Sequence, residues 1–439
     1  MKTRLSLLAA GLAFALPALA ADWPQWRGPD RTGVSKETGL LQQWPKGGPK
    51  LLWTYRNAGL GFSTTAIVSD RIYTLGAIDE VEYVLALDVK GDKVSEAWRA
   101  KIGPIFTFLG NVWGDGPRGT PTVDGKYLYA LGGQGELVCV ETANGKEVWR
   151  KDLIKQLGGE MMSDWGYSES PLIDGDLLIC TPGGQKGTLA ALKKATGEVV
   201  WRSTDLKYTA PYSSIVVSEA GGVRQYVQNG YIDDTEGGVV FGVAAKDGAA
   251  LWTEPFFKGS SYAIAPMPIV RGNLVYVTAG YGAGCHLFEL TPAGKRLKAA
   301  DRYEKRERKT MKNTHGGVVL VGNHVYGHSE GLGWVCQEFE TGKVVWNERN
   351  KLECKSGATT AADGFLYYFT DEGEIALVKA TPEGWQEQGT FTIPEKSKLS
   401  PARRTGRQAM VWTQPVIANG RLYLRDQELL FCYDIQAKK

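Results

Sequence analysis

The stretch CVETANGKEVW, residues 139–149, decides the fold because close copies of it recur along the chain. Each copy has a small or apolar residue, a glycine-centred turn and a tryptophan ten positions after the start. The other clear copies are ALKKATGEVVW at 191–201, GVAAKDGAALW at 242–252 and CQEFETGKVVW at 336–346. Successive tryptophans lie 51, 52 and 51 residues apart, at Trp98, Trp149, Trp201 and Trp252. Such regular intervals indicate an internal structural repeat.

A second landmark recurs with the same period: a tight turn followed by alternating apolar residues. Clear copies are VDGKYLYALG at 123–132, IDGDLLICTPG at 173–183, ADGFLYYFT at 362–370 and ANGRLYLRD at 418–426. Eight copies, some divergent, can be aligned. Repeats of about 40 to 50 residues that contain short alternating strands are typical of propeller blades.

Each repeat divides into four strands, A to D, with the first landmark at the C–D turn and the second at the A–B turn. The eighth repeat lacks a D strand, whereas PKLLWTY at 49–55 is a D-like strand with no A to C strands before it. Because a ring leaves no free sheet at its ends, we expect this segment to complete blade eight. The predicted fold class is all-β, an eight-bladed β-propeller of four-stranded antiparallel blades closed by an N-terminal strand.

The amino end carries features of a signal peptide: Lys2 and Arg4, an apolar run over 5–16 and small residues before a cleavage site after Ala20 or Ala21. We therefore expect a signal peptide at 1–21, an N-terminal extension at 22–48, and a propeller at 49–439. The protein is expected to be periplasmic or secreted. No later segment offers the roughly 20 uninterrupted apolar residues of a membrane span, so membrane insertion is not expected.

Composition excludes other classes of protein. Hydrophobic residues make up 43% of the chain and charged residues 23%, as in ordinary globular proteins. The formal net charge is only +3, which argues against a nucleic-acid partner. Three of the six cysteines, Cys139, Cys336 and Cys432, occupy equivalent repeat positions. This equivalence favours buried free thiols over disulfides, although the sequence leaves pairing open.

Strand direction alternates within a blade, so the A–B and C–D turns share one side of the ring, here called the turn side. The D–A and B–C connections share the other, the loop side, and every long or unusual segment falls there. Because binding residues concentrate in loops on a rigid frame, the loop side is the candidate functional surface.

The repeats ending in tryptophan resemble the docking motif of the pyrroloquinoline quinone (PQQ) repeat family, and DWPQWRGPDRTGVS at 22–35 resembles the segment before blade one in its exported members. The resemblance covers about residues 22–436. It implies a propeller but leaves the function open, because the same repeat serves quinoprotein alcohol dehydrogenases, polyvinyl-alcohol-dehydrogenase-like proteins and the lipoprotein propeller of the outer-membrane barrel assembly machinery. The chain lacks the adjacent-cysteine pair of the large dehydrogenases.

Binding of PQQ with Ca²⁺ would need aromatic faces for stacking, cations for three carboxylates, and oxygen ligands for the metal. Candidates for the first two needs, all on the loop side, are Trp113, Arg118, Trp165, Trp334, Trp412 and Arg425. Asp115 or Glu169 would be the catalytic base. We expect Arg118 and Glu169 to be neighbours at the mouth of the channel. Metal ligands stay unassigned.

Two function classes remain open. The first is a small-molecule or glycan site in a funnel on the loop side, in its sharpest form a PQQ-dependent dehydrogenase of alcohols or sugars. The second is a non-catalytic scaffold that uses the same side, or an exposed blade edge, to hold a protein partner. The substrate, the partner and the oligomeric state are left open by the sequence.

Overall fold

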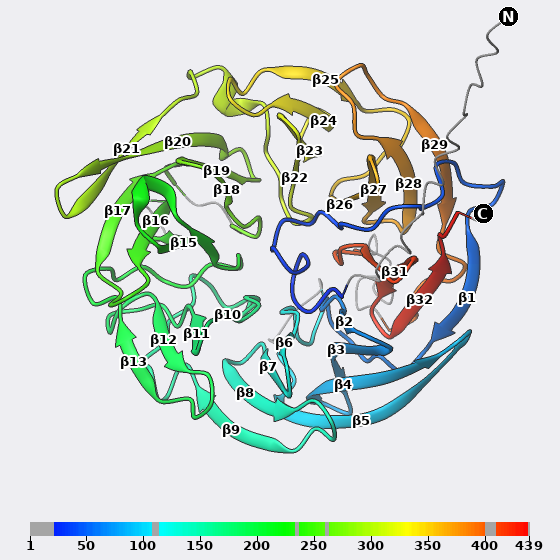
Figure 1. Ribbon diagram of the computed structural model, residues 1–439, viewed down its shortest axis with the longest axis horizontal. Coiled ribbons are helices and arrows are strands. Elements are labelled where there is room, and N and C mark those ends of the chain that lie inside the picture. The colour runs from blue at the N-terminus through cyan, green and yellow to red at the C-terminus, as the bar shows by residue number, and fades with distance from the viewer. Residues whose placement is uncertain (1–21, 108–113, 233–236, 260–262, 400–409, 438–439) are drawn as a thin grey trace, which may run out of the picture.

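Eight four-stranded antiparallel sheets form a closed ring in the computed structural model (Figure 1). The structure describes residues 22–107, 114–232, 237–259, 263–399 and 410–437. Within these ranges the strands follow the predicted A-to-D order in every blade. The predicted eight-bladed propeller is therefore confirmed.

The first four blades take up the chain in sequence order. Blade 1 contains β2 (Ala66–Val68), β3 (Arg71–Ile78), β4 (Val81–Lys90) and β5 (Lys93–Pro104). Blade 2 contains β6 (Thr122–Asp124), β7 (Tyr127–Leu131), β8 (Glu136–Glu141) and β9 (Glu147–Asp152). Blade 3 contains β10 (Leu172–Asp174), β11 (Leu177–Cys180), β12 (Ala190–Lys193) and β13 (Val199–Arg202). Blade 4 contains β14 (Val216–Ser218), a 3₁₀ turn η1 (Ala220–Gly222), β15 (Gln225–Tyr231), β16 (Gly238–Ala244) and β17 (Ala250–Pro255).

The remaining blades continue around the ring. Blade 5 contains β18 (Ile269–Arg271), β19 (Leu274–Ala279), β20 (Gly284–Ala293) and β21 (Arg296–Asp301), followed by η2 (Glu307–Lys309). Blade 6 contains β22 (Val319–Val321), β23 (His324–Ser329), β24 (Gly333–Glu338) and β25 (Val344–Glu348). Blade 7 contains β26 (Gly357–Ala362), β27 (Phe365–Thr370), β28 (Glu374–Lys379) and β29 (Glu387–Thr392). Blade 8 contains β30 (Val416–Ala418), β31 (Arg421–Asp426), β32 (Leu429–Asp434) and β1 (Lys50–Tyr55).

The ring closes where the two ends of the propeller meet. Strand β1 pairs antiparallel with β32, in a register that joins Lys50 to Asp434, Trp53 to Cys432 and Tyr55 to Leu430. The two strands lie side by side at the right of Figure 1, where the blue and red ends of the chain meet. Closure by the N-terminal strand is therefore confirmed.

Tryptophans near the blade edges join neighbouring blades. The Trp98 indole of blade 1 donates through Nε1 to the Thr142 carbonyl of blade 2, at 3.2 Å, and Trp149 donates to the Lys194 carbonyl of blade 3, at 2.9 Å. The C–D turn of the next blade covers each ring. Gly145 has a φ of 73° there, and a Cβ at this position would lie 2.5 Å from the Trp98 ring. Glycine is thus required both by the turn and by the contact.

The N-terminal extension crosses the middle of the ring (Figure 1). The Trp23 amide donates to the Ile67 carbonyl of blade 1 and the Ser35 amide to the Ala361 carbonyl of blade 7, both at 2.8 Å. Between them, buried Arg31 donates to the Ser170 carbonyl before blade 3, at 2.7 Å, and buried Arg27 donates to the Val318 carbonyl before blade 6. The extension therefore links blades 1 and 3 to blades 6 and 7 across the ring.

All six cysteines are free thiols, and five are buried, with Cys354 half-buried. The predicted packing role of Cys139, Cys336 and Cys432 is confirmed, since each lies in a hydrophobic cluster between strands. In the described ranges, no helix is long and apolar enough to cross a membrane.

We predict that Trp149→Ala lowers the free energy of unfolding by about 3–5 kcal/mol, the usual cost of removing a large buried aromatic side chain. Trp149 is 9% exposed and joins two blades, so its loss leaves a cavity at a seam. Chemical denaturation of the mature protein measures the effect.

Trp149→Phe and Trp53→Phe form a matched pair that isolates the indole N–H. Among the described residues, the buried Nε1 of Trp53 has no hydrogen-bond partner, whereas Nε1 of Trp149 has the Lys194 carbonyl. Trp149→Phe should therefore cost about 1–3 kcal/mol more than Trp53→Phe, because only it leaves a carbonyl unpaired. Equal costs would contradict the assigned role of these hydrogen bonds.

Candidate functional site

The centre of the loop side is a cluster of aromatic and cationic side chains from several blades. Its members come from the D–A connections: Phe62 and Phe106 flank blade 1, Arg118 precedes blade 2, His315 precedes blade 6, and Trp412 precedes blade 8. We call these five residues the central cluster. Because each A strand is the innermost of its blade, residues just before it converge near the ring axis.

Arg118 anchors one side of the central cluster. Its guanidinium lies over the Phe106 ring, 4.4 Å from the centroid, and 5.9 Å from the Phe62 centroid. Two of its nitrogens donate to backbone carbonyls, at 2.8 Å to Trp165 and 3.2 Å to Gly114. Burial lowers the pKa of Arg118 to about 10, so the side chain stays cationic at neutral pH.

His315 and Trp412 form the other side. Their rings are stacked, with centroids 4.2 Å apart and planes 12° apart, and Phe62 lies 5.2 Å from the Trp412 ring. Burial, and then the charge of Arg118, lower the pKa of His315 to about 4. The imidazole is therefore neutral at physiological pH and acts here as a stacking surface.

The other predicted residues of this region lie around Arg118. Asp115 is half-buried and close enough to favour the charged form of Arg118. Trp165 is half-buried, and its carbonyl accepts from Arg118. The nearby Tyr212 hydroxyl forms a hydrogen bond with Ser163. Trp113 lies outside the described residues.

Glu169 lies elsewhere and has its own partners. Its side chain is 2% exposed, and its carboxylate accepts from the Thr181 amide at 2.7 Å and from the Thr181 hydroxyl at 3.0 Å. Burial raises the pKa of Glu169 to about 8, an effect that these hydrogen bonds and Arg31 partly offset. The backbones of Gly119 and Glu169 are adjacent, but no ion pair of Arg118 with Glu169 occurs among the described residues.

Arg425 and Trp334 are also buried, and their side chains have other partners. Arg425 is 1% exposed and makes six hydrogen bonds, five to backbone carbonyls and one to the Thr74 hydroxyl. Its acceptors include Ala58, Gly59 and Leu75, so it joins blade 8 to blade 1. Trp334 is fully buried, donates to the Leu352 carbonyl at 2.9 Å and packs on Tyr368, with ring centroids 4.0 Å apart.

The structure thus brings together Asp115, Arg118, Trp165 and Trp412, whereas the side chains of Glu169, Trp334 and Arg425 are bound to other partners. Sequence reasoning missed Phe62 and Phe106, which hold the Arg118 guanidinium. Phe62 stands in GLGFSTT at 59–65, a short connection without the charged or aromatic run that drew attention to other loops.

The described residues offer a poor set of ligands for PQQ with Ca²⁺. The guanidinium of Arg425 is occupied by protein acceptors, and the Trp412 ring already has stacking partners. Within the described ranges, no group of three or more His, Cys, Asp and Glu side chains is arranged to hold a metal ion. A loop-side cavity of about 340 Å³ between blades 6 and 7 is lined by Glu330, Arg349, Glu353 and Lys355 among others, away from the central cluster.

Comparison with known proteins gives two kinds of likeness. One known protein, outer membrane protein assembly factor BamB of Kangiella koreensis, is 32% identical over 92 residues, which cover 21% of this chain and 20% of that protein. The matched region thus spans about a fifth of the relative's length. Among solved structures, BamB from Moraxella catarrhalis has a TM-score of 0.58 at 15% identity, covering 89% of this chain and 98% of that one.

Quinoprotein enzymes share the same architecture. Quinohemoprotein alcohol dehydrogenase from Comamonas testosteroni has a TM-score of 0.61 at 12% identity, covering 95% of this chain and 81% of that chain. A europium-containing methanol dehydrogenase has the same TM-score and identity, covering 92% of this chain and 89% of that chain. At these identities the likeness concerns the fold alone.

A family profile described as outer membrane protein assembly factor BamB matches residues 80–348, more than half of the chain. Together with the eight-bladed ring, this match shows that the chain belongs to that family of PQQ-like repeat propellers.

Proposed function

We propose that the protein is an exported scaffold that binds a protein partner, as the name of the BamB family suggests, and that it is not a quinoprotein dehydrogenase. One observation carries the proposal: residues that could serve a quinone or its substrate hold the ring together instead. The Arg425 guanidinium donates six hydrogen bonds within the protein, and the buried Glu169 side chain accepts from Thr181. A catalytic base must reach its substrate, and a buried carboxyl group in this setting is a structural hydrogen-bond acceptor.

Export is part of the proposal. The positively charged start, the apolar run over 5–16 and the small residues before Ala20 and Ala21 support removal of a signal peptide. Sequencing the amino terminus of the protein from its native cell would test this point, since the mature chain should begin at residue 21 or 22.

The outer strands of neighbouring blades offer a surface for a partner. Val199 and Val200 on β13 are 43% and 46% exposed, and Val148 on β9 is 38% exposed. These strands are the outer edges of blades 3 and 2, so their outward backbone groups are available for pairing. A partner strand that adds to β13 would gain main-chain hydrogen bonds and cover both valines.

A second candidate function is binding of an anionic or polyhydroxylated small molecule at the central cluster. It is favoured by Arg118, a half-buried cation among aromatic rings on the side where the loops converge. Asp115, Trp165 and Trp412 would be the neighbouring contacts. A PQQ-dependent dehydrogenase would have to bind PQQ and Ca²⁺ at this same site.

A cofactor-retention experiment separates these functions. Mature protein is incubated with PQQ and Ca²⁺, desalted, and scanned for quinone absorbance, with Arg118→Ala treated in parallel. The scaffold proposal predicts no retained quinone and the same melting temperature with and without PQQ. Stoichiometric retention that Arg118→Ala weakens by about tenfold or more would overturn the scaffold proposal in favour of the loop-side site.

The role of Glu169 can be tested by pH. Its pKa is about 8 in the folded protein and ordinarily 4.5, so the unfolded chain releases the proton first as pH rises. Wild type should therefore lose stability relative to Glu169→Gln between pH 4.5 and 8, by about 2–5 kcal/mol in total. Denaturation curves across this range measure the difference, with exposed Glu383→Gln as the control that stays level with wild type. Parallel curves for Glu169→Gln and wild type would mean that Glu169 is solvated and available as a base.

A further inference from the structure

A cavity of about 460 Å³ opens on the turn side at the seam between blades 8 and 1. Blade 8 contributes Arg421 and Tyr423, blade 1 contributes Asp70, Ile72 and Val89, and the extension contributes Asp22. Its volume falls within the range of small-molecule sites. The cavity lies at the closing seam, on the opposite side of the ring from the central cluster.

The neighbouring seam between blades 1 and 2 shows how the corresponding place is filled there. There the Thr142 carbonyl accepts three hydrogen bonds: from Arg71 at 3.1 Å, from the Tyr73 hydroxyl at 3.4 Å, and from the Trp98 indole at 3.2 Å. One backbone oxygen in the C–D turn of blade 2 thus collects three donors from blade 1. This convergence closes the seam.

The closing seam has the three donors but not the acceptor. Arg421 begins β31 as Arg71 begins β3, Tyr423 follows two residues later as Tyr73 does, and Trp53 is the tryptophan of blade 8. The residue equivalent to Thr142 is Val89, which lies inside β4 rather than in a turn. The buried Nε1 of Trp53 has no hydrogen-bond partner among the described residues.

The acceptor is missing because the β4–β5 hairpin of blade 1 is longer than its counterpart in blade 2. The paired residues Ala86 and Trp98 of blade 1 are 12 positions apart, whereas the equivalent pair Cys139 and Trp149 of blade 2 is 10 apart. The two extra residues extend the strand ladder and move the turn outward. Arg421 follows the turn and donates to the Gly91 carbonyl at 3.1 Å, leaving open the space that the turn fills elsewhere.

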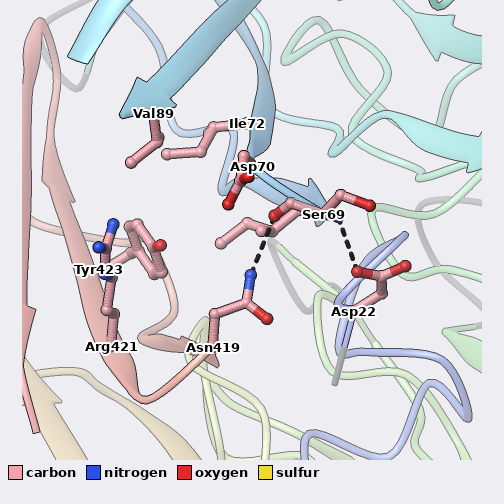
Figure 2. Close-up of a pocket in the computed structure, with 9 residues that line it drawn as sticks. Asp22, Ser69, Asp70, Ile72, Val89, Asn419, Arg421 and Tyr423 are labelled. Atoms are coloured by element: carbon pink, nitrogen blue, oxygen red, sulfur yellow. Dashed lines mark hydrogen bonds between the residues drawn. The ribbon is translucent and has the colours of Figure 1, made fainter. Parts of the chain in front are cut away.

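The walls of the cavity carry opposite charges. Figure 2 shows Arg421 and Tyr423 on one side, Asp70, Ser69 and Asp22 on the other, and the apolar side chains of Ile72 and Val89 between them. The Asp22 carboxylate accepts from the Ser69 amide at 2.8 Å. Asn419 donates to the Ser69 carbonyl at 3.0 Å and so holds the two blades at a fixed separation.

We propose that this cavity binds a short peptide with free ends. Its terminal carboxylate takes the position of the missing Thr142-like carbonyl and accepts from Arg421 and Tyr423, a charge-assisted pairing that favours an anion over a neutral amide. Its ammonium lies toward Asp70, and an apolar side chain rests on Ile72 and Val89. This site is separate from the proposed partner surface and does not depend on it.

Calorimetric titration of the mature protein with the dipeptide leucyl-alanine tests the proposal. We expect saturable binding of one dipeptide per chain, weakened about tenfold or more for the C-terminal amide and for the N-acetyl form. Arg421→Gln should weaken binding of the free dipeptide about as much as amidation does. It should not weaken binding of the amide further. Asp70→Asn should weaken binding of the free dipeptide about as much as N-acetylation does. It should not weaken binding of the N-acetyl form further.

Arg71→Gln is the matched control, because Arg71 holds the equivalent position at a seam whose acceptor is present. It should leave dipeptide affinity unchanged. If Arg421→Gln does not fold, as judged by circular dichroism, Tyr423→Phe replaces it and should weaken the dipeptide severalfold. The proposal is overturned if wild type shows no saturable binding in the millimolar range, if the amide binds as well as the free dipeptide, or if Arg71→Gln weakens binding as much as Arg421→Gln.

Discussion

The pairing of β1 with β32 is the constraint on which the rest of the molecule depends. Without it, blade 8 has three strands, and the chain is an open array with two exposed ends. The same seam is fastened by five of the six hydrogen bonds of Arg425, whose acceptors include Ala58 and Gly59 after β1 and Leu75 in blade 1. Closing the ring also fixes the course of the extension, because the extension crosses the channel and then continues into β1 at Lys50.

Burying Arg425 would be costly if any of its donors stayed unpaired. The six acceptors remove that cost, and its pKa, lowered to about 9 by burial, still leaves it charged at neutral pH. Glu169 shows the converse case, because burial favours its neutral form. The inner part of the ring thus contains charged residue types that act as structural links, which supports the proposed scaffold over a reactive channel.

The sequence predicted the architecture well because the repeats record it directly. Turn glycines, alternating apolar residues and regularly spaced tryptophans each have a local physical cause, and all recur once per blade. The role of Arg425 could not be predicted in this way, since its acceptors are backbone carbonyls at distant positions and carry no side-chain signature. The contacts of the extension could not be predicted for the same reason. Arg27 and Arg31 donate to the backbone carbonyls of Val318 and Ser170, which no sequence motif marks. The side chains of Arg118 and Glu169 do not pair, because Arg118 donates to the Trp165 carbonyl and Glu169 accepts from Thr181.

A departure from the repeat can be as informative as the repeat. Two extra residues in the β4–β5 hairpin remove one acceptor from the closing seam and leave a cavity there, and among the described residues the Trp53 indole N–H has no partner. Closure must then rest on β1 pairing, on Arg425 and on the packing of Trp53, without the indole hydrogen bond that Trp98 and Trp149 make. Hydrogen exchange of the backbone amides measures the stability of the β1–β32 pairing most directly. We predict that the paired amides of β1 exchange as slowly as those of β9, at the rate of global unfolding. Exchange in β1 that is orders of magnitude faster than in β9 would show that the ring opens at this seam, and would contradict the account.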